Sequence, residues 1–168
     1  MERWDAYNRH GQRTGRMLIR GEPIPDGLYH LVCEVLVRHR DGRFLCMKRA
    51  LCKTDYPGFY EATAGGSALL GEDKYQCVRR ELQEETGILC EDFQEVHVGI
   101  YPEDNTIFYS FVCVVDCDPD AVALQEGETI DFCWLDEDAF VALAKSGRIV
   151  DRQLRRFRSY FEKRRIPV

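Results

Sequence analysis

The stretch of sequence that decides the fold is GGSALLGEDKYQCVRRELQEETGI, residues 65–88. It opens on a Gly65-Gly66 pair, which predicts a turn, and continues through helix-forming residues with Glu72 and Asp73 where a first helical turn would lie. Thr86-Gly87 then provides a stop signal. These signals predict a helix of about fourteen residues. At ~100° per residue, its core-facing stripe comprises Tyr75, Val78 and Leu82.

Three glutamates, Glu81, Glu84 and Glu85, crowd the end of this predicted helix and share an arc of about 100° at the edge of the apolar stripe. Such a charge run is usually a solvated acidic face. However, like charges three or four residues apart repel by a few tenths of a kcal/mol, and carboxylates in a last turn oppose the helix dipole by about 0.3–1 kcal/mol. A hard cation removes this penalty, since Mg²⁺ binds a few carboxylates and takes phosphate oxygens as further ligands. The cluster therefore predicts a Mg²⁺ or Mn²⁺ site for a substrate that carries phosphates.

Segments on both sides of the helix alternate in β-branched and aromatic residues, which is typical of strands. Asp41-Gly42 and Asp104-Asn105 are turn signals that join antiparallel pairs. Strands are predicted at 28–39, 43–50, 59–63, 93–101 and 106–117, and helices at 136–147 and 150–165. This order predicts an α/β sandwich with a mixed β-sheet. The polar residues 1–27 suit turns or a short hairpin better than core.

Composition narrows the class of protein. The chain has 168 residues, of which 45% are hydrophobic and 31% charged, as in an ordinary soluble domain. A net charge of −6 argues against a nucleic acid as the main partner. No run approaches the ~18 apolar residues of a membrane span, and the first residues lack the apolar stretch of a secretory signal. The eight cysteines contain no C-x-x-C pair, so we predict reduced thiols and a cytoplasmic protein rather than a zinc site or a disulfide framework.

The quoted stretch resembles the sequence box of the Nudix hydrolases. That box runs Gly, five residues, Glu, seven residues, Arg-Glu, an aliphatic residue, any residue, Glu-Glu, any residue, Gly and an aliphatic residue. Every fixed position is matched, by Gly66, Glu72, Arg80, Glu81, Leu82, Glu84, Glu85, Gly87 and Ile88. The strand order is also similar to the Nudix α/β/α sandwich. The resemblance implies a Nudix hydrolase domain over residues 28–168, with residues 1–27 as a polar N-terminal extension packed on it.

The resemblance implies a reaction and roles for the box residues. The reaction is Mg²⁺-dependent hydrolysis of the pyrophosphate bond of a nucleoside diphosphate linked to another moiety, by water attack at phosphorus. The three glutamates at the helix end would hold one or more metal ions, with one of them as the alternative general base. Glu72 would pair with Arg80, and together they would orient Glu81. A backbone carbonyl at Gly65 would reach the metal.

Signals outside the box leave alternatives open. Glu128 precedes a Trp-containing strand, where many Nudix relatives place one more catalytic acid, and it also fits an exposed loop carboxylate. Lys48 and Arg49 end a strand, where they would contact a phosphate or remain solvated. The basic residues of 148–165 alternate with apolar ones and are interpreted as the solvated face of an amphipathic helix rather than an RNA site. The substrate, the number of metals and a homodimer stay open.

Two rival functions use the same scaffold. The branch of isopentenyl-diphosphate isomerases carries a nucleophilic Cys and a metal-binding His before the box, whereas residues 53–76 contain neither Cys nor His. This departure argues against isomerisation. The second rival is a Nudix domain that binds a nucleotide without cleaving it. Such domains usually lose box glutamates, and this chain retains them all.

Overall fold

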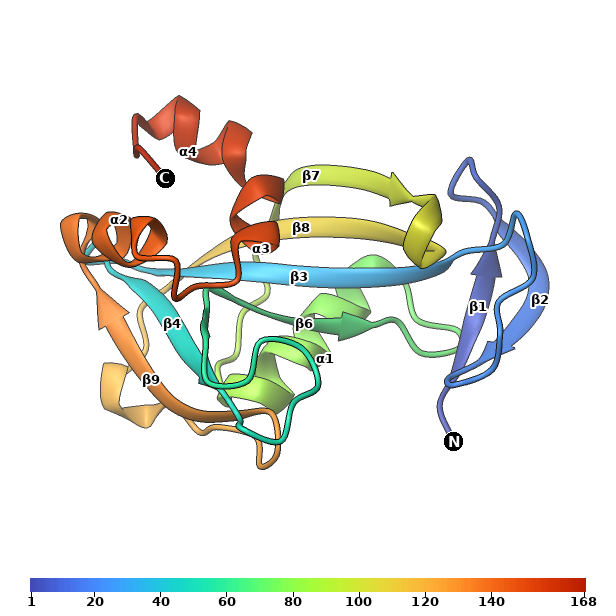
Figure 1. Ribbon diagram of the computed structural model, residues 1–168, viewed down its shortest axis with the longest axis horizontal. Helices are drawn as coiled ribbons and strands as arrows, with labels where there is room; N and C mark the ends of the chain where they lie inside the picture. The colour runs from blue at the N-terminus through green and yellow to red at the C-terminus, as the bar shows by residue number, and fades with distance from the viewer.

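The computed structural model describes residues 1–168 and contains a seven-stranded sheet (Figure 1). Its strands are β3 (His30–His39), β4 (Phe44–Arg49), β5 (Tyr60–Glu61), β6 (Thr63–Ser67), β7 (Gln94–Tyr101), β8 (Thr106–Val115) and β9 (Thr129–Leu135). The order is β5-β4-β3-β8-β7, with β6 also paired to β3 and β9 to β4. β3 and β8 run parallel and the other pairs are antiparallel, so the predicted mixed sheet is confirmed.

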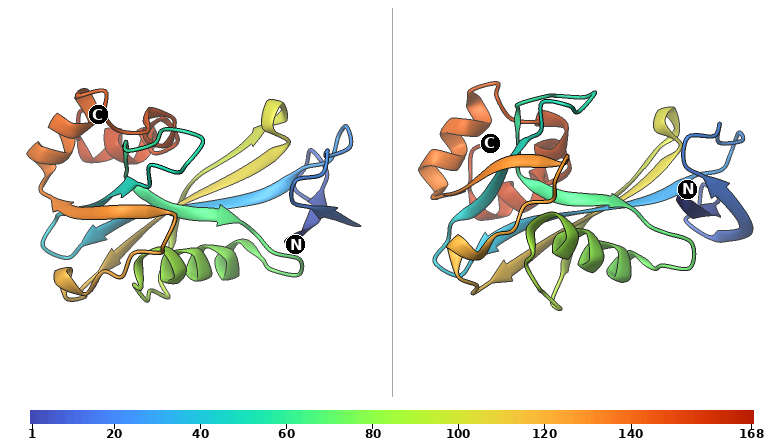
Figure 2. Two further views of the ribbon diagram at one scale, coloured as in Figure 1. Left: turned by 60° about the horizontal axis from the view of Figure 1, so that its bottom comes forward. Right: turned by 90° about the horizontal axis from the view of Figure 1, so that it is seen from below.

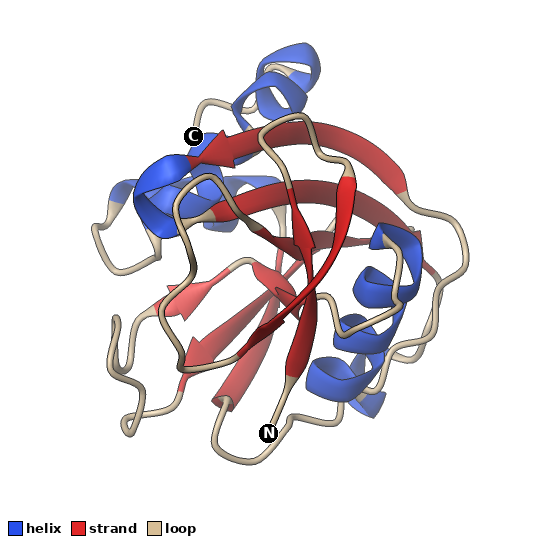
Figure 3. Cartoon of the chain, turned by 90° about the vertical axis from the view of Figure 1, so that its right-hand side faces the viewer, coloured by secondary structure: helices blue, strands red, loops and turns tan.

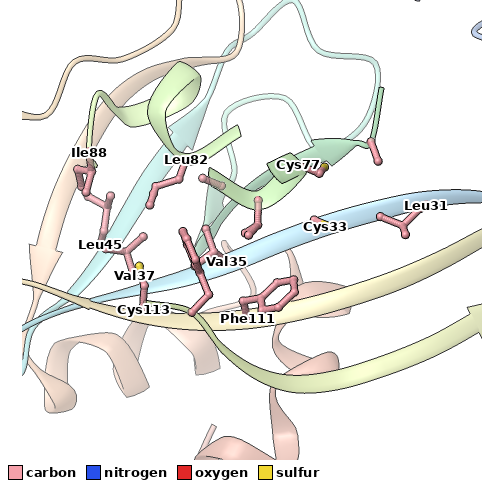
Figure 4. Close-up of a cluster of buried hydrophobic side chains, with 14 of the residues drawn as sticks. Leu31, Cys33, Val35, Val37, Leu45, Cys77, Leu82, Ile88, Phe111 and Cys113 are labelled. Carbon is pink, nitrogen blue, oxygen red and sulfur yellow. The ribbon is translucent and has the colours of Figure 1, made fainter. Parts of the chain in front are cut away.

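Helices cover both faces of the sheet (Figure 2). Helix α1 (Lys74–Thr86) lies on one face, and α2 (Glu137–Lys145), α3 (Asp151–Arg156) and α4 (Arg158–Arg164) lie on the other. Strand β3 separates two cores, because successive side chains of a strand point to opposite faces. Cys33 and Val35 join Leu82 of α1 (Figure 4), whereas Leu36 packs with Phe161 of α4. The predicted α/β/α sandwich is confirmed.

Helix α1 forms close to where the sequence predicts it, but Glu72 and Asp73 precede its first turn instead of lying in it. Asp73 caps its start by accepting hydrogen bonds from the amides of Tyr75 and Gln76, and Gly87 ends it in the left-handed region at φ 72°. The predicted core stripe needs one correction. Val78 and Leu82 are fully buried, but Tyr75, in the first turn, is 43% exposed, and its ring packs on Phe111.

The glycine pair at the start of the quoted stretch lies in a strand and not in the predicted turn. Gly65 and Gly66 belong to β6 and pair with Glu34 and Cys33 of β3. Both positions require glycine because a side chain would not fit. A Cβ atom at Gly65 would lie 2.2 Å from the carbonyl oxygen of Cys33, and one at Gly66 would lie 2.6 Å from Oε1 of Glu81.

Two further elements differ from the prediction. Strand β9 is the Trp-containing strand expected after Glu128, but the predicted order of elements omitted it, although it pairs along most of β4. The helix predicted at 150–165 is divided into α3 and α4, because the backbone leaves helical geometry at Phe157. Phe157 is buried in the core between the sheet and these helices.

The N-terminal residues form the expected hairpin, β1 (Arg3–Tyr7) with β2 (Arg13–Ile19), next to the end of β3. Figure 3 views the molecule from this end. Contrary to the prediction, the hairpin contributes to the core. A small cluster contains Trp4, Ala6, Leu18 and Leu28, and Tyr7 joins the core beside α1. None of the helices is both long enough and apolar enough to cross a membrane.

Candidate active site

A cavity of about 390 Å³ is lined by the first residues of the quoted stretch, by the C-terminal part of α1 and by neighbouring strands. Only four of its 23 lining residues are hydrophobic. The acidic lining residues are Glu2, Glu34, Glu61, Glu81, Glu84, Glu85 and Glu128, and the basic ones are Arg20, Arg49, Lys53, Arg80, Arg152 and Arg156. Such a lining suits a polyanion bound together with a cation, not an apolar ligand.

Arg80 is the centre of a hydrogen-bonded network in this cavity. Its Nε and Nη2 atoms donate to the two carboxylate oxygens of Glu72 at 2.7 and 2.9 Å. Its Nη1 atom donates to Glu81 at 2.8 Å and to Glu84 at 3.0 Å, and Nη2 also donates to the carbonyl of Ser67 at 3.1 Å. The pair of Glu72 and Arg80 expected from the resemblance is therefore present, and it contacts Glu81 directly.

The network, together with burial, shifts the pKa values of its side chains. Hydrogen bonding to Glu72 raises the pKa of Arg80, so this side chain stays charged. Burial pushes the pKa of Glu72 upward, but the bonds from Arg80 and the Leu69 amide outweigh it, and the pKa is lowered overall. For Glu81 burial dominates, and its pKa is raised despite the contact with Arg80.

Glu85 stands apart from the other acidic side chains. It lies in the middle of the buried face of α1, not at the edge predicted from the helical arc, and it is only 8% exposed. Its one hydrogen bond comes from the amide of Gly65, at 3.1 Å. Burial, followed by the nearby carboxylates of Glu61 and Glu81, raises its pKa well above the ordinary value.

Every other acidic side chain that lines the cavity has a basic partner. Glu81 and Glu84 share Arg80, and the remaining pairs are Glu2–Arg20, Glu34–Arg156, Glu61–Arg49 and Glu128–Lys53. Glu85 alone has no cation within ion-pair distance. A buried carboxylate without a counter-charge is costly unless it is protonated or bound to a metal.

The donor set fits a hard divalent cation in its chemistry. Carboxylates and a backbone carbonyl are the oxygen ligands that Mg²⁺ takes, and Glu81, Glu84, Glu85 and Gly65 all line the cavity. No three acidic, His or Cys side chains are gathered around one point, because Glu81 and Glu84 are turned toward Arg80. These residues therefore offer ligands for a metal without forming a closed cage.

Residues outside the box reach the cavity in part as predicted. Glu128 lines it from the loop before β9 and forms an ion pair with Lys53. Arg49 lines it and contacts Glu61 at 2.7 Å, whereas Lys48, the alternative phosphate contact, is not part of the lining. Arg156 corrects the interpretation of 148–165 as a solvated helix face. Its side chain is 10% exposed and forms a buried ion pair with Glu34.

The comparisons with known proteins agree with the box and the fold. The family model described as the NUDIX domain matches residues 28–157. An uncharacterized Nudix hydrolase of Listeria monocytogenes is 32% identical over 151 residues, 89% of each chain. The chain belongs to the Nudix hydrolase family. It is accordingly an enzyme, a Nudix pyrophosphohydrolase, of a family that acts on nucleoside diphosphate derivatives.

Solved structures show the same Nudix fold. The protein DR0079 of Deinococcus radiodurans superposes with a TM-score of 0.69 at 18% identity, over 88% of this chain and 91% of that one. The Nudix domain of NrtR from Shewanella oneidensis, solved in complex with ADP ribose, gives a TM-score of 0.56 at 14% identity, over 68% of this chain and 77% of that one. At these identities the likeness concerns the fold alone.

Sequence reasoning missed several lining residues of this Nudix hydrolase. Glu34 is one of them, and an isolated Glu inside the apolar run LVCEVLV was a signal for it. Arg152 and Arg156 carried no such signal, because their position over the cavity depends on how α3 packs on the sheet. Cys33 also borders the cavity, but its thiol donates to the carbonyl of Lys74 and burial raises its pKa. It therefore stays protonated and is not an activated nucleophile.

Proposed function

We propose that this Nudix hydrolase uses Mg²⁺, with Mn²⁺ as a substitute, to cleave the pyrophosphate bond of a nucleoside diphosphate linked to another moiety. The reaction is water attack at phosphorus. The observation that carries the proposal is Glu85, a buried carboxylate without a cation partner in a cavity whose other acids are all paired. A divalent cation held by these carboxylates would supply the missing charge.

The proposed metal ligands are Glu81, Glu84, Glu85 and the carbonyl of Gly65. The metal, when bound, neutralises phosphate charge and lowers the pKa of a water molecule. The protein's own residues position the metal ligands. Glu72 holds Arg80 by two hydrogen bonds, and Arg80 in turn fixes the carboxylate of Glu81.

Glu128 is proposed as one more acid that takes part in catalysis. It lines the cavity from the loop before β9 and is held by Lys53, so this loop adds a carboxylate that can accept a proton. Arg49 is proposed as a phosphate contact. Its guanidinium lines the cavity while Glu61 fixes its orientation, which leaves further N–H groups for a ligand oxygen.

A nucleotide derivative is proposed as the small-molecule substrate. The family acts on such compounds, and the NrtR domain with the same fold binds ADP ribose. The free state of all eight cysteines supports a reducing compartment, so we propose that the enzyme works in the cytoplasm.

The experiment is a substrate panel with purified protein: ADP ribose, nucleoside diphosphate sugars, dinucleotides, coenzyme A and nucleoside triphosphates. Hydrolysis of at least one compound is expected with Mg²⁺ or Mn²⁺. Excess chelator is expected to abolish it, because the phosphates cannot approach an unneutralised acidic cluster. Hydrolysis that continues undiminished in chelator would refute the metal requirement.

Variants and one further substrate separate this function from its rivals. Glu85→Gln is expected to lower hydrolysis by orders of magnitude, whereas Glu137→Gln, an exposed glutamate in the first turn of α2, leaves it unchanged. Isopentenyl diphosphate is expected to give no dimethylallyl diphosphate, and its appearance would show that a nucleophile had been overlooked. Tight binding of a nucleotide with no product from any compound would favour the non-catalytic rival.

A further inference from the structure

The hairpin of β1 and β2 contacts the loop that carries Glu72. This loop, residues 68–73, joins β6 to α1. The carboxylate of Asp5 accepts a hydrogen bond from the amide of Gly71 at 2.9 Å, and the carbonyl of Arg3 accepts one from the amide of Leu70 at 2.8 Å. Nη2 of Arg13 donates to the carbonyl of Glu72 at 2.5 Å. Three consecutive loop residues are thus bonded to the hairpin.

The hairpin side of these contacts is itself fixed. Asp5 and Arg13 lie 3.4 Å apart as an ion pair, and Nε of Arg13 donates to the hydroxyl of Tyr7 at 3.2 Å. Tyr7 is buried in the main core, and its backbone forms two hydrogen bonds with Tyr29. Asp5 and Arg13 therefore connect Tyr7 of the domain core to the loop through a chain of polar contacts.

A second contact leads from the hairpin to Arg80. The rings of Trp4 and His30 are stacked with their centroids 4.3 Å apart. His30 contacts the hydroxyl of Ser67 at 3.3 Å, and the carbonyl of the same Ser67 accepts a bond from Arg80. The two residues that flank the hairpin, Glu2 before β1 and Arg20 after β2, form an ion pair and belong to the lining of the cavity.

We propose that the N-terminal hairpin is part of the catalytic apparatus, with Asp5 and Arg13 as positioning residues for Glu72. By fixing the loop, they hold the Glu72 carboxylate where it binds both Arg80 and the amide of Leu69. A loop released from the hairpin would let Glu72 move away from Arg80, and Arg80 would hold Glu81 less well. The kinetic part of this inference rests on the proposed hydrolysis, whereas the placement of Glu72 does not.

The kinetic test compares Asp5→Ala with two other variants. Asp5→Ala is expected to lower kcat about tenfold with KM little changed, the lower end of the range for residues that orient metal ligands, because Asp5 acts on Glu81 only through Glu72 and Arg80. Asp5→Asn keeps an oxygen that accepts from Gly71 and is expected to retain most of the turnover. Glu22→Ala removes an exposed acid of the same hairpin region that makes no contact with the loop, and it is expected to match the parent.

A double-mutant cycle asks whether Asp5 acts through Glu72. In a Glu72→Ala background, Asp5→Ala is expected to cause no further loss of kcat, because the group it positions is absent. An equal loss in both backgrounds would overturn the proposal, as would an equal loss in Glu22→Ala. Arg13→Ala repeats the test at a side chain that is 45% exposed and so tolerates truncation even if Asp5→Ala fails to fold.

An independent measurement does not require substrate. The Leu69 amide donates to Glu72 at 2.8 Å, so its hydrogen exchange reports the position of that carboxylate. Exchange of this amide is expected to accelerate in Asp5→Ala and in Arg13→Ala, and to stay at the parent rate in Glu22→Ala. Unchanged exchange in both hairpin variants would overturn the proposal even if hydrolysis is found. Faster exchange in a protein that hydrolyses nothing would instead count against the proposed function alone.

Discussion

At the scale of single residues, Arg80 and Glu85 solve opposite electrostatic problems. Arg80 carries one positive charge and contacts three carboxylates, so it offsets part of the repulsion that the sequence predicts at the end of α1. Glu85 receives no such help. The electrostatic penalty predicted for the three glutamates at the end of α1 therefore falls mainly on Glu85, because Glu81 and Glu84 have a basic partner.

Replacing Arg80 separates positioning from metal binding. Arg80→Ala is expected to lower turnover by about 10- to 100-fold while Mg²⁺ still binds, because the ligand oxygens remain but their orientation is lost. Activity assays together with calorimetric titration of Mg²⁺ measure both effects. Arg79→Ala is the matched control, since its ion pair is with the exposed Glu91. Complete loss of Mg²⁺ binding in a folded Arg80→Ala protein would contradict the role.

Replacing Glu85 tests the cost of its charge. Its folded-state pKa is raised, so the ionised form destabilises the metal-free fold at neutral pH, and this penalty disappears as the pH falls below the raised pKa toward the ordinary 4.5. Without metal at pH 7, the melting temperature of Glu85→Gln is expected to equal or exceed that of the parent. The difference between the two melting temperatures is expected to shrink as the pH is lowered. Mg²⁺ should raise the melting temperature of the parent more than that of the variant. A variant that melts several degrees below the parent without metal would mean that Glu85 is structural.

At the scale of elements, local signals predicted α1 and the strand pairs β3–β4 and β7–β8. The positions of the other strands depend on pairing between residues far apart in the sequence. Asp73 and Gly87 cap α1 by contacts within a few residues, which the sequence encodes directly. Gly65 and Gly66 were misread because a glycine pair usually marks a turn. Here the glycines admit the backbone of β3 and the carboxylate of Glu81, neither of which is visible in local sequence.

The contact between the hairpin and the sheet is expected to depend on pH through His30. Thr106 donates its hydroxyl proton to the carbonyl of Asp104, so it accepts from Nε2 of a neutral His30 ring, and Nδ1 faces Ser67. Burial, aided by Arg20, lowers the pKa of His30 to about 4.

A lowered histidine pKa means that stability is present above the ordinary value of 6.5 and is lost as the pH falls toward about 4. Between pH 7 and 5 the melting temperature of the parent is expected to fall more than that of His30→Gln, which does not titrate. Thermal melts of both proteins across this range measure the difference. Parallel pH profiles would show that folding does not lower the pKa of His30.

At the scale of the whole molecule, the box predicted the family, the enzyme class and the α/β/α fold. The part of the cavity lining formed by Glu34 and Arg156 could not be predicted. Glu34 and Arg156 are 122 residues apart and meet only because α3 packs over β3 and β8. The roles predicted for Glu72, Arg80 and the three glutamates of α1 remain proposals, now supported by contacts that the sequence could only suggest.

The buried pair of Glu34 and Arg156 is expected to matter for stability. Arg156→Ala leaves Glu34 buried without its partner, so it is expected to lower the free energy of unfolding by about 3–5 kcal/mol, measured by chemical denaturation. Arg155→Ala, next to it in α3, removes an exposed ion pair with Asp151 and is expected to change stability by less than about 1 kcal/mol. Equal effects of the two variants would mean that the buried pair contributes no more than a surface pair.

The central claim is that water attacks a phosphorus atom of a pyrophosphate bond, supported by Mg²⁺ at the carboxylates of α1. The most direct measurement is hydrolysis of the best compound of the panel in ¹⁸O-labelled water with Mg²⁺, with products analysed by mass spectrometry. One ¹⁸O atom is expected on the phosphate group of one product and none on the other, with no labelled product in chelator or from Glu85→Gln. Label that enters a carbon-bound hydroxyl instead of a phosphate, or labelling that persists without a divalent metal, would contradict the account.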